Sequence, residues 1–152
     1  MNQAIHLRIL RLQEDARLPE QATSGSAGID LYSCGVVNHN EQHNLLKVST
    51  GLSVAFPSSH AMLVLPRSGL ATKLGLTLAN SPALIDSDYR GEIFLVFKYT
   101  KGALEEAYDA LAPGNRVAQI LMVPTPNVVP FEVSELDETE RGSGGFGSSG
   151  ES

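Results

Sequence analysis

The segment NSPALIDSDYRGE, residues 80–92, brings a carboxylate, an aromatic ring and a guanidinium together within one expected turn. The apolar pair Leu84 and Ile85 leads into Asp86, and a carboxylate held beside apolar side chains can act as a general base. Tyr89 offers a flat ring that could pack against a sugar. The alternative interpretation is a plain polar turn in which Arg90 pairs with a carboxylate.

Two further segments carry groups suited to an anion. LPRSGLATK, residues 65–73, places Arg67 and Ser68 at a glycine turn that could open a short helix, and such amide and guanidinium groups suit a phosphate. It is not a Walker loop, because the GxxxxGK[ST] pattern is absent. In GNRVAQ, residues 114–119, strand alternation predicts opposite faces for Arg116 and Gln119 unless a bulge intervenes.

Two glycine-containing segments are open to two interpretations each. Asp30 follows a turn of small residues, where it could be a functional carboxylate or a structural one that bonds local amides. Residues 135–140 are acidic and residues 141–150 are half glycine, which is typical of a flexible tail. A featureless linker, however, needs neither Arg141 nor Phe146.

Composition excludes several classes of protein. The chain has 152 residues, which is about one domain, and a formal net charge of −6. We therefore expect no nucleic-acid or membrane partner, since both need a basic face. Cys34 is the only cysteine, so no intrachain disulfide can form, and we expect it to be a half-buried filler. No signal peptide or long apolar run is present in the sequence, so we expect a cytoplasmic protein.

Short apolar runs between turn residues predict many strands and few helices. A polar surface turn is expected at 37–44, and its two histidines are not expected to bind metal. One short helical turn could form at 68–73. Residues 103–111 contain good helix formers and could also be helical, but glycine and proline flank them, so a hairpin return strand is expected at Glu106 to Ala110. The pattern favours an antiparallel sandwich, jelly roll or barrel. Strands are expected at 5–10, 45–48, 51–56, 61–65, 74–78, 93–99, 117–123 and 128–133.

Five segments in this order resemble the motifs of the trimeric deoxyuridine triphosphate nucleotidohydrolases (dUTPases). They cover most of the chain, from about residue 22 to residue 150. One such motif alone would be weak, whereas all five in order are specific. The motifs are AGIDLYS (27–33), PRSGL (66–70), ALIDSDYRG (83–91), GNRVAQ (114–119) and RGSGGFGSSG (141–150).

The resemblance implies an all-β, jelly-roll or β-barrel-like subunit of a homotrimer, with a core at residues 1–134. A flexible arm at 135–152 would close over an active site shared between subunits. The implied reaction is hydrolysis of dUTP to dUMP and pyrophosphate with magnesium (Mg²⁺). This reaction would keep uracil out of DNA and supply dUMP for dTMP synthesis.

The resemblance also implies a role for individual residues. Asp86 would activate the water that attacks the α-phosphorus, helped by Gln119, and Asp30 would hold the Mg²⁺ ion through water. Tyr89 would pack under the deoxyribose, and the hairpin with Asn80 and Leu84 would bind uracil. The remaining substrate-binding residues would be Arg67, Ser68 and Gly69 in the core, and Arg141, Phe146, Gly147, Ser148 and Ser149 in the arm.

Two features leave room for alternatives. Ala83 stands where many family members have glycine, and it would be strained if that position needs a positive φ. A dCTP deaminase of the same fold would use a glutamate to activate water at the base. A non-catalytic trimeric module that kept nucleotide-binding loops is the other alternative.

Overall fold

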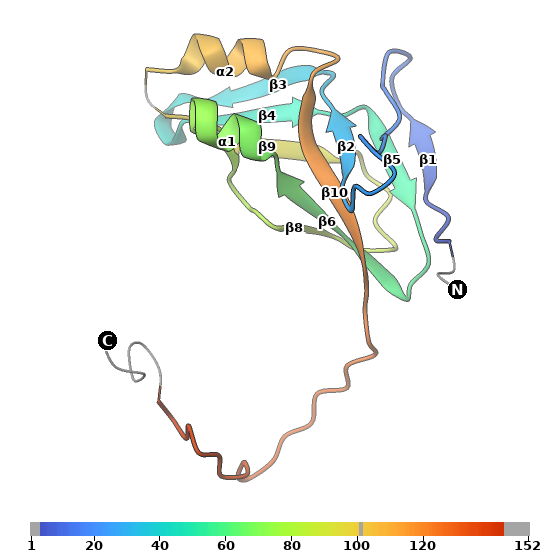
Figure 1. The fold of residues 1–152 in the computed structure, drawn as a ribbon, viewed down its shortest axis with the longest axis vertical. Helices are drawn as coiled ribbons and strands as arrows, with labels where there is room; N and C mark the ends of the chain where they lie inside the picture. The colour runs from blue at the N-terminus through green and yellow to red at the C-terminus, as the bar shows by residue number, and fades with distance from the viewer. Residues whose placement is uncertain (1–3, 101, 145–152) are drawn as a thin grey trace.

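The computed structural model describes residues 4–100 and 102–144. Three antiparallel sheets account for the strands (Figure 1). The smallest sheet pairs β1 (Arg8–Arg11) with β5 (Leu52–Ala55). One four-stranded sheet has the order β2 (Ile29–Tyr32), β10 (Arg116–Pro124), β6 (His60–Pro66) and β8 (Ala83–Ile85). The other has the order β3 (Gly35–Asn40), β4 (Leu45–Ser49), β9 (Phe94–Lys98) and β7 (Thr77–Leu78).

The two four-stranded sheets face each other across one apolar core. Alternation along the strands produces this core: in β4, Leu46 and Val48 are fully buried and Lys47 between them is not. Leu31, Met62 and Ile120 from the first sheet meet Leu46 and Phe97 from the second in one cluster. This all-β, jelly-roll-like arrangement confirms the expected fold class.

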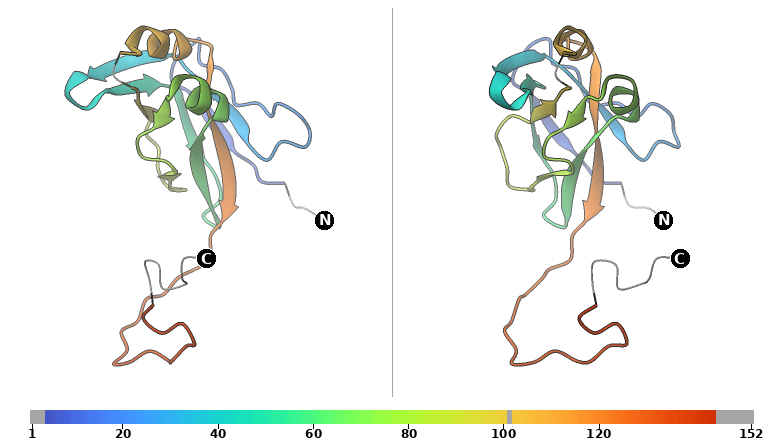
Figure 2. Two further views of the ribbon diagram at one scale, coloured as in Figure 1. Left: turned by 60° about the vertical axis from the view of Figure 1, so that its left-hand side comes forward. Right: turned by 90° about the vertical axis from the view of Figure 1, so that its left-hand side faces the viewer.

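Two short helices lie beside the sandwich (Figures 1 and 2). The helix α1 (Ser68–Leu74) follows β6 directly, as the sequence predicted, and Gly75 ends it with a φ of 62°. The expected strand at 74–78 is therefore reduced to Thr77 and Leu78, because Leu74 belongs to the helix.

The expected hairpin strand at Glu106 to Ala110 is wrong. These residues form the helix α2 (Leu104–Ala110). Good helix formers favour this conformation, and Ala107 and Leu111, one helical turn apart, are both buried in the core. A single apolar face of this kind is enough to hold a short helix against the sandwich.

The expected turn at 37–44 is also partly wrong. Residues up to Asn40 belong to β3, and only the 3₁₀ turn Glu41–His43 and Asn44, which has a left-handed backbone, lie outside the sheet. The Nε2 atom of His39 lies 2.8 Å from the hydroxyl of Tyr99, which gives this imidazole a structural hydrogen-bond partner.

The other expected strands have mixed outcomes. Those at 45–48, 51–56, 61–65, 93–99 and 117–123 are confirmed with small shifts of their ends. The strand expected at 5–10 begins only at Arg8. The strand expected at 128–133 is wrong, because these residues pair with nothing among the described residues.

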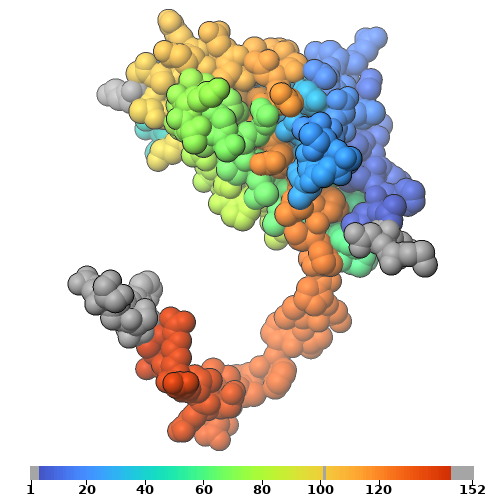
Figure 3. Space-filling view, viewed as in Figure 1, coloured from blue at the N-terminus to red at the C-terminus, as the bar shows by residue number. Residues whose placement is uncertain are grey.

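After Pro124 the chain leaves the sandwich as an extended tail that lies apart from the folded body (Figures 1 and 3). The tail's apolar side chains are strongly exposed: Val128 is 72% exposed and Phe131 is 83% exposed. In the described part of the chain, neither helix is long and apolar enough to cross a membrane.

Ser33 connects α2 to the sheets. Its side chain is buried, donates to the carbonyl of Leu111 at 2.6 Å and accepts from the amide of Gly35 at 2.8 Å. Its backbone also bonds Gly114 and Asn115, just before β10. The hydroxyl thus joins Leu111, at the end of α2, to the start of β3, and the backbone of Ser33 joins the turn before β10.

Ser33→Ala should lower the free energy of unfolding by about 1–3 kcal/mol, because it leaves a part-buried amide and a buried carbonyl without their partner. Urea unfolding at one fixed protein concentration measures this change. Ser58→Ala, on an exposed turn, is the matched control and should be neutral. Equal stabilities for the two variants would contradict the structural role of Ser33.

Candidate active site

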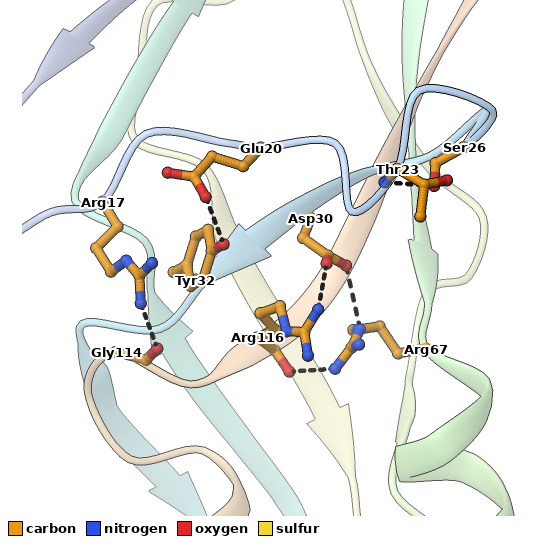
Figure 4. A network of polar contacts seen from close by, with 9 residues as sticks. All are labelled: Arg17, Glu20, Thr23, Ser26, Asp30, Tyr32, Arg67, Gly114 and Arg116. Carbon is orange, nitrogen blue, oxygen red and sulfur yellow. Dashed lines mark hydrogen bonds and ion pairs between the residues drawn. The ribbon is translucent and has the colours of Figure 1, made fainter.

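A nearly buried carboxylate holds two guanidinium groups at the end of one sheet (Figure 4). Asp30 lies in β2, Arg67 lies between β6 and α1, and Arg116 is the first residue of β10. Oδ1 of Asp30 is 3.2 Å from Nε of Arg67, and Oδ2 is 3.2 Å from Nη1 of Arg116. Arg67 also donates from Nη1 to the backbone carbonyl of Arg116 at 3.0 Å. Segments far apart in the sequence are therefore fixed to one another here.

The burial of these groups explains why they need one another. The Asp30 side chain is only 11% exposed, so its negative charge would be costly without positively charged partners. The Arg116 side chain is 49% exposed, so part of its guanidinium group remains open to solvent. Two positive charges face one negative charge, which leaves a net positive charge open to solvent. The arrangement can therefore bind an anion despite the acidic total.

A cavity of about 340 Å³ lies over this ion-pair cluster. It brings together most of the residues expected to bind phosphate and metal. Of the predicted site residues, those lining it are Asp30, Arg67, Ser68, Gly69 and Gln119. Arg116 also lines the cavity, although the sequence analysis did not include it among the site residues.

A bulge in β10 puts Arg116 and Gln119 on the same cavity. In the pairing with β2, Arg116 faces Tyr32 while Ala118 faces Leu31, so Val117 is the extra residue on β10. One extra residue reverses the alternation of side chains. This is the exception that the sequence analysis left open.

The absence of a side chain at Gly28 leaves room for the side chain of Gln119 beside the cavity. The amide nitrogen of Gln119 donates to the carbonyl of Pro66 at 3.0 Å. A Cβ atom at position 28 would run into Oε1 of Gln119, so the close approach requires glycine. Gly28 was not among the predicted site residues, although it lies two positions before Asp30 in the first motif.

A second group of expected site residues lines a different cavity, of about 240 Å³. Leu84, Asp86 and Tyr89 meet there with Lys47, Glu92 and Phe94. This cavity shares no lining residue with the first. The described chain therefore does not bring Asp86 to the cavity that holds Arg67 and Gln119.

The turn that carries Asp86 is braced from within. The hydroxyl of Tyr89 donates to the carbonyl of Glu92 at 3.0 Å. Nη1 of Arg90 donates to the carbonyls of Ser87 and Tyr89, each at 2.8 Å. Arg90 thus bonds backbone oxygens, and no ion pair to a carboxylate is found for it in the described chain.

The remaining expected site residues lie outside both groups. Asn80 is exposed in the loop before β8, and Ala83 pairs with Val64. Ala83 does not have a positive φ, since Asn44 alone has one among the described non-glycine residues, so the expected strain is absent. Arg141 is exposed and bonds the carbonyl of Gly144. Phe146, Gly147, Ser148 and Ser149 lie outside the described residues.

The chain offers little for a directly bound metal. Over residues 4–100 and 102–144, no group of three or more His, Cys, Asp or Glu side chains is placed to hold one. Within the described part of the chain, Asp30 is the one carboxylate that lines the first cavity. This donor set fits Mg²⁺ bound through water, because that ion keeps several waters and uses few carboxylates together with substrate phosphates.

Cys34 has no sign of catalytic reactivity. Burial, and then the negative charges of Asp15 and Glu92, raise the pKa of its thiol above the ordinary value. A raised pKa keeps the sulfur protonated at neutral pH, and a protonated thiol is a poor nucleophile. This agrees with the expected half-buried filler.

Comparisons with known proteins point to one family. The dUTPase family model matches residues 14–150. The deoxyuridine 5'-triphosphate nucleotidohydrolase of Hydrogenobaculum sp. is 41% identical over 144 residues, which cover 95% of this chain and 97% of that protein. The enzyme of the same name from Rickettsia typhi is 43% identical and covers 96% of this chain and 97% of its own length.

Solved structures show the same fold. The dUTPase of Staphylococcus bacteriophage 80alpha, in complex with dUPNHPP, has a TM-score of 0.80 at 25% identity and covers 95% of this chain and 98% of its own. A dUTPase variant of phage phi11 of S. aureus has a TM-score of 0.71 at 22% identity and covers 88% and 99%. That protein is described as coordinating a structural Mg(II) ion.

Gly28→Ala should displace Gln119 and narrow the first cavity. We expect inorganic triphosphate to bind at least about tenfold more weakly, the effect of losing roughly 1.4 kcal/mol. Isothermal titration calorimetry measures this affinity. Gly25→Ala is the matched control, because nothing lies within 4 Å of its added Cβ. Unchanged binding by Gly28→Ala would show that the position of Gln119 does not contribute to anion binding.

Proposed function

We infer the function of this chain from one premise, namely that it belongs to the dUTPase family. It is a dUTP diphosphatase, which hydrolyses dUTP to dUMP and pyrophosphate. The observation that carries the assignment of residues is the cavity that joins Asp30, Arg67, Ser68 and Gln119. By lowering dUTP, the enzyme keeps uracil out of DNA and supplies dUMP for dTMP synthesis.

The first cavity binds the phosphates. The exposed parts of Arg67 and Arg116 offer planar donors to phosphate oxygens, and Ser68 and Gly69 add a hydroxyl and backbone amides. Asp30 keeps acceptor capacity on both oxygens besides its arginine bonds, so it can also accept from water bound to Mg²⁺. The ion, when bound, neutralises charge on the phosphates.

Asp86 orients the attacking water and takes its proton, and Gln119 helps to position that water. The water oxygen bonds the α-phosphorus as the bond from this phosphorus to the bridging oxygen breaks, and pyrophosphate leaves. Phosphoryl transfer of this kind depends on positioning and charge neutralisation more than on covalent chemistry. A single well-placed carboxylate is therefore sufficient for the proton transfer.

The second cavity accepts the nucleoside. Leu84 and Tyr89 are exposed around it, which suits apolar contact with a base and a sugar. Tyr89 is fixed by its bond to the Glu92 carbonyl, so its ring can act as a rigid wall that excludes a 2′-hydroxyl. The loop with Asn80 leads into β8 and supplies backbone groups for uracil.

The arm at 135–152 closes over the bound nucleotide. Arg141, Ser148 and Ser149 bind the outer phosphates, Gly147 allows close backbone approach, and Phe146 stacks on uracil. Ordering such a glycine-rich segment costs roughly 1–2 kcal/mol for each residue, which the bound phosphates must offset.

A homotrimer completes the site. The two cavities of one chain share no lining residue, and this supports a site in which the Asp86 turn of one copy faces the arginine cavity of another. The exposed apolar side chains of the tail also need a partner surface, and a neighbouring copy offers one. One assembly thus accounts for both observations.

The dCTP deaminase alternative is less well supported. Its catalytic residue would be a glutamate beside the base, and Glu92 lines the second cavity. However, Oε1 of Glu92 is occupied by the hydroxyl of Ser49 and by the amide of Gly51. Incubation with dCTP should release no ammonia.

Asp86→Asn should lower kcat for dUTP by about 10²–10⁴-fold, the usual contribution of a general base, and leave dUTP binding nearly intact. Pyrophosphate release from purified protein measures this rate. Asp88→Asn removes a carboxylate from the same exposed turn and serves as the matched control. Turnover by Asp86→Asn within tenfold of the wild type would exclude the water-activating role.

Mixing two inactive variants tests the shared site. Asp86→Asn and Arg67→Ala should each be inactive alone, but trimers refolded from a mixture should regain part of the activity. Some sites in the mixed trimers combine an intact Asp86 from one copy with an intact Arg67 from another. Failure of the mixture to recover any activity, with trimers present, would show that both residues act within one chain.

A further inference from the structure

We propose that Arg17, Glu20 and Tyr32 are positioning residues for the phosphate cavity, although none of them lines it. Together they fasten the N-terminal segment 17–20 to β2 and to the turn before β10 (Figure 4). This inference rests on the proposed function of that cavity as the phosphate site.

The backbone of segment 17–20 supports Asp30 directly. β2 pairs with β10 along one edge, and Glu20 forms a bridge with Asp30 along the other. The amide of Asp30 donates to the carbonyl of Glu20 at 2.8 Å, and the amide of Glu20 donates back at 3.3 Å. The residue that organises both arginines is therefore held from both sides.

The side chains fasten the same segment a second time. The hydroxyl of Tyr32 donates to Oε2 of Glu20 at 3.3 Å. Arg17 places its guanidinium 3.9 Å from the centroid of the Tyr32 ring, a cation–π contact. Tyr32 is itself buried, and it lies opposite Arg116 in the sheet.

Arg17 extends the connection to the loop that carries Arg116. Its Nη1 donates to the carbonyl of Gly114 at 3.4 Å, two residues before Arg116. The amide of Gly114 in turn donates to the carbonyl of Ser33 at 2.7 Å. Arg17 thus contacts both the strand of Asp30 and the turn that begins β10.

We expect these contacts to fix the position of β2 more than to raise the free energy of unfolding. Arg17 and Glu20 are exposed, and exposed charged contacts add little to the free energy of unfolding. The bonds from Asp30 to Arg67 and Arg116 are nonetheless sensitive to the position of β2. A shift of about 1 Å in a binding group can cost a large factor in activity.

Steady-state kinetics on Arg17→Ala tests the proposal in the full chain. The arginines contact phosphates in the ground state and in the transition state alike, so KM for dUTP should rise about five- to tenfold with little change in kcat. Arg17→Lys, which keeps a cation over the ring, should recover most of the affinity. Arg11→Ala, which removes the same charge from exposed β1, is the matched control and should behave as the wild type.

Tyr32→Phe provides a second test, because it keeps the ring and its contact with Arg17 and removes only the bond to Glu20. We expect a rise in KM of about two- to threefold, as for the loss of one weak hydrogen bond. Equal KM values for Arg17→Ala and Arg11→Ala would overturn the proposal. A loss of active protein in Arg17→Ala, seen as a lower kcat and a lower melting temperature at unchanged KM, would also overturn it.

A binding measurement separates this proposal from the function on which it rests. If the wild type fails to hydrolyse dUTP, the assignment of the reaction is wrong. Isothermal titration calorimetry of inorganic triphosphate binding then tests the positioning role without relying on the reaction. Weaker binding by Arg17→Ala than by Arg11→Ala would support it, and equal binding would overturn it.

Discussion

The ion-pair cluster of Asp30 with Arg67 and Arg116 is the constraint on which the rest of the site depends. A carboxylate that is 11% exposed is tolerable only with partners, so the fold must deliver both guanidinium groups to it. Asp30 in turn fixes the position of both guanidinium groups, and Arg67 also donates to the carbonyl of Arg116. The cluster therefore stabilises the ends of β2, β6 and β10 and leaves positive charge available to a ligand.

Two local departures from regular structure bring Gln119 to the same cavity as the ion-pair cluster. The bulge at Val117 turns Arg116 to the side of Gln119, and the missing side chain of Gly28 gives Gln119 room to bond Pro66. A regular strand would separate the two side chains, and any larger residue at position 28 would displace the amide. The second departure can be found in the sequence as a glycine, whereas the first has no sequence signal that we recognise.

The sequence predicted those parts of the structure that depend on local pattern. Short apolar runs located β4, β6, β9 and β10, and the turn residues between them marked their ends. The sequence-based prediction failed where the local pattern fits both a helix and a strand. The segment of α2 is short enough to resemble a strand, and its helical conformation depends on the packing of Ala107 and Leu111 against the core. The apolar run at 128–133 likewise resembles a strand but has no partner strand in the described chain. For the site, the motifs contain the predicted residues that line the two cavities. They did not predict that the two cavities lie apart in one chain, because spacing along a chain does not fix distance in space.

The negative net charge of the chain does not prevent the cavity from binding an anion, because the effect of a charge falls with its distance from the ligand. At physiological ionic strength charges are screened beyond about 8 Å, so the distributed carboxylates act weakly on a phosphate that already contacts Arg67 and Arg116. The local excess of positive charge, two guanidinium groups on one carboxylate, therefore acts at contact distance, where the acidic total of the chain has little influence. An anion-binding cavity on an acidic protein thus needs its cations gathered in one place, and the pairing of both arginines with Asp30 gathers them.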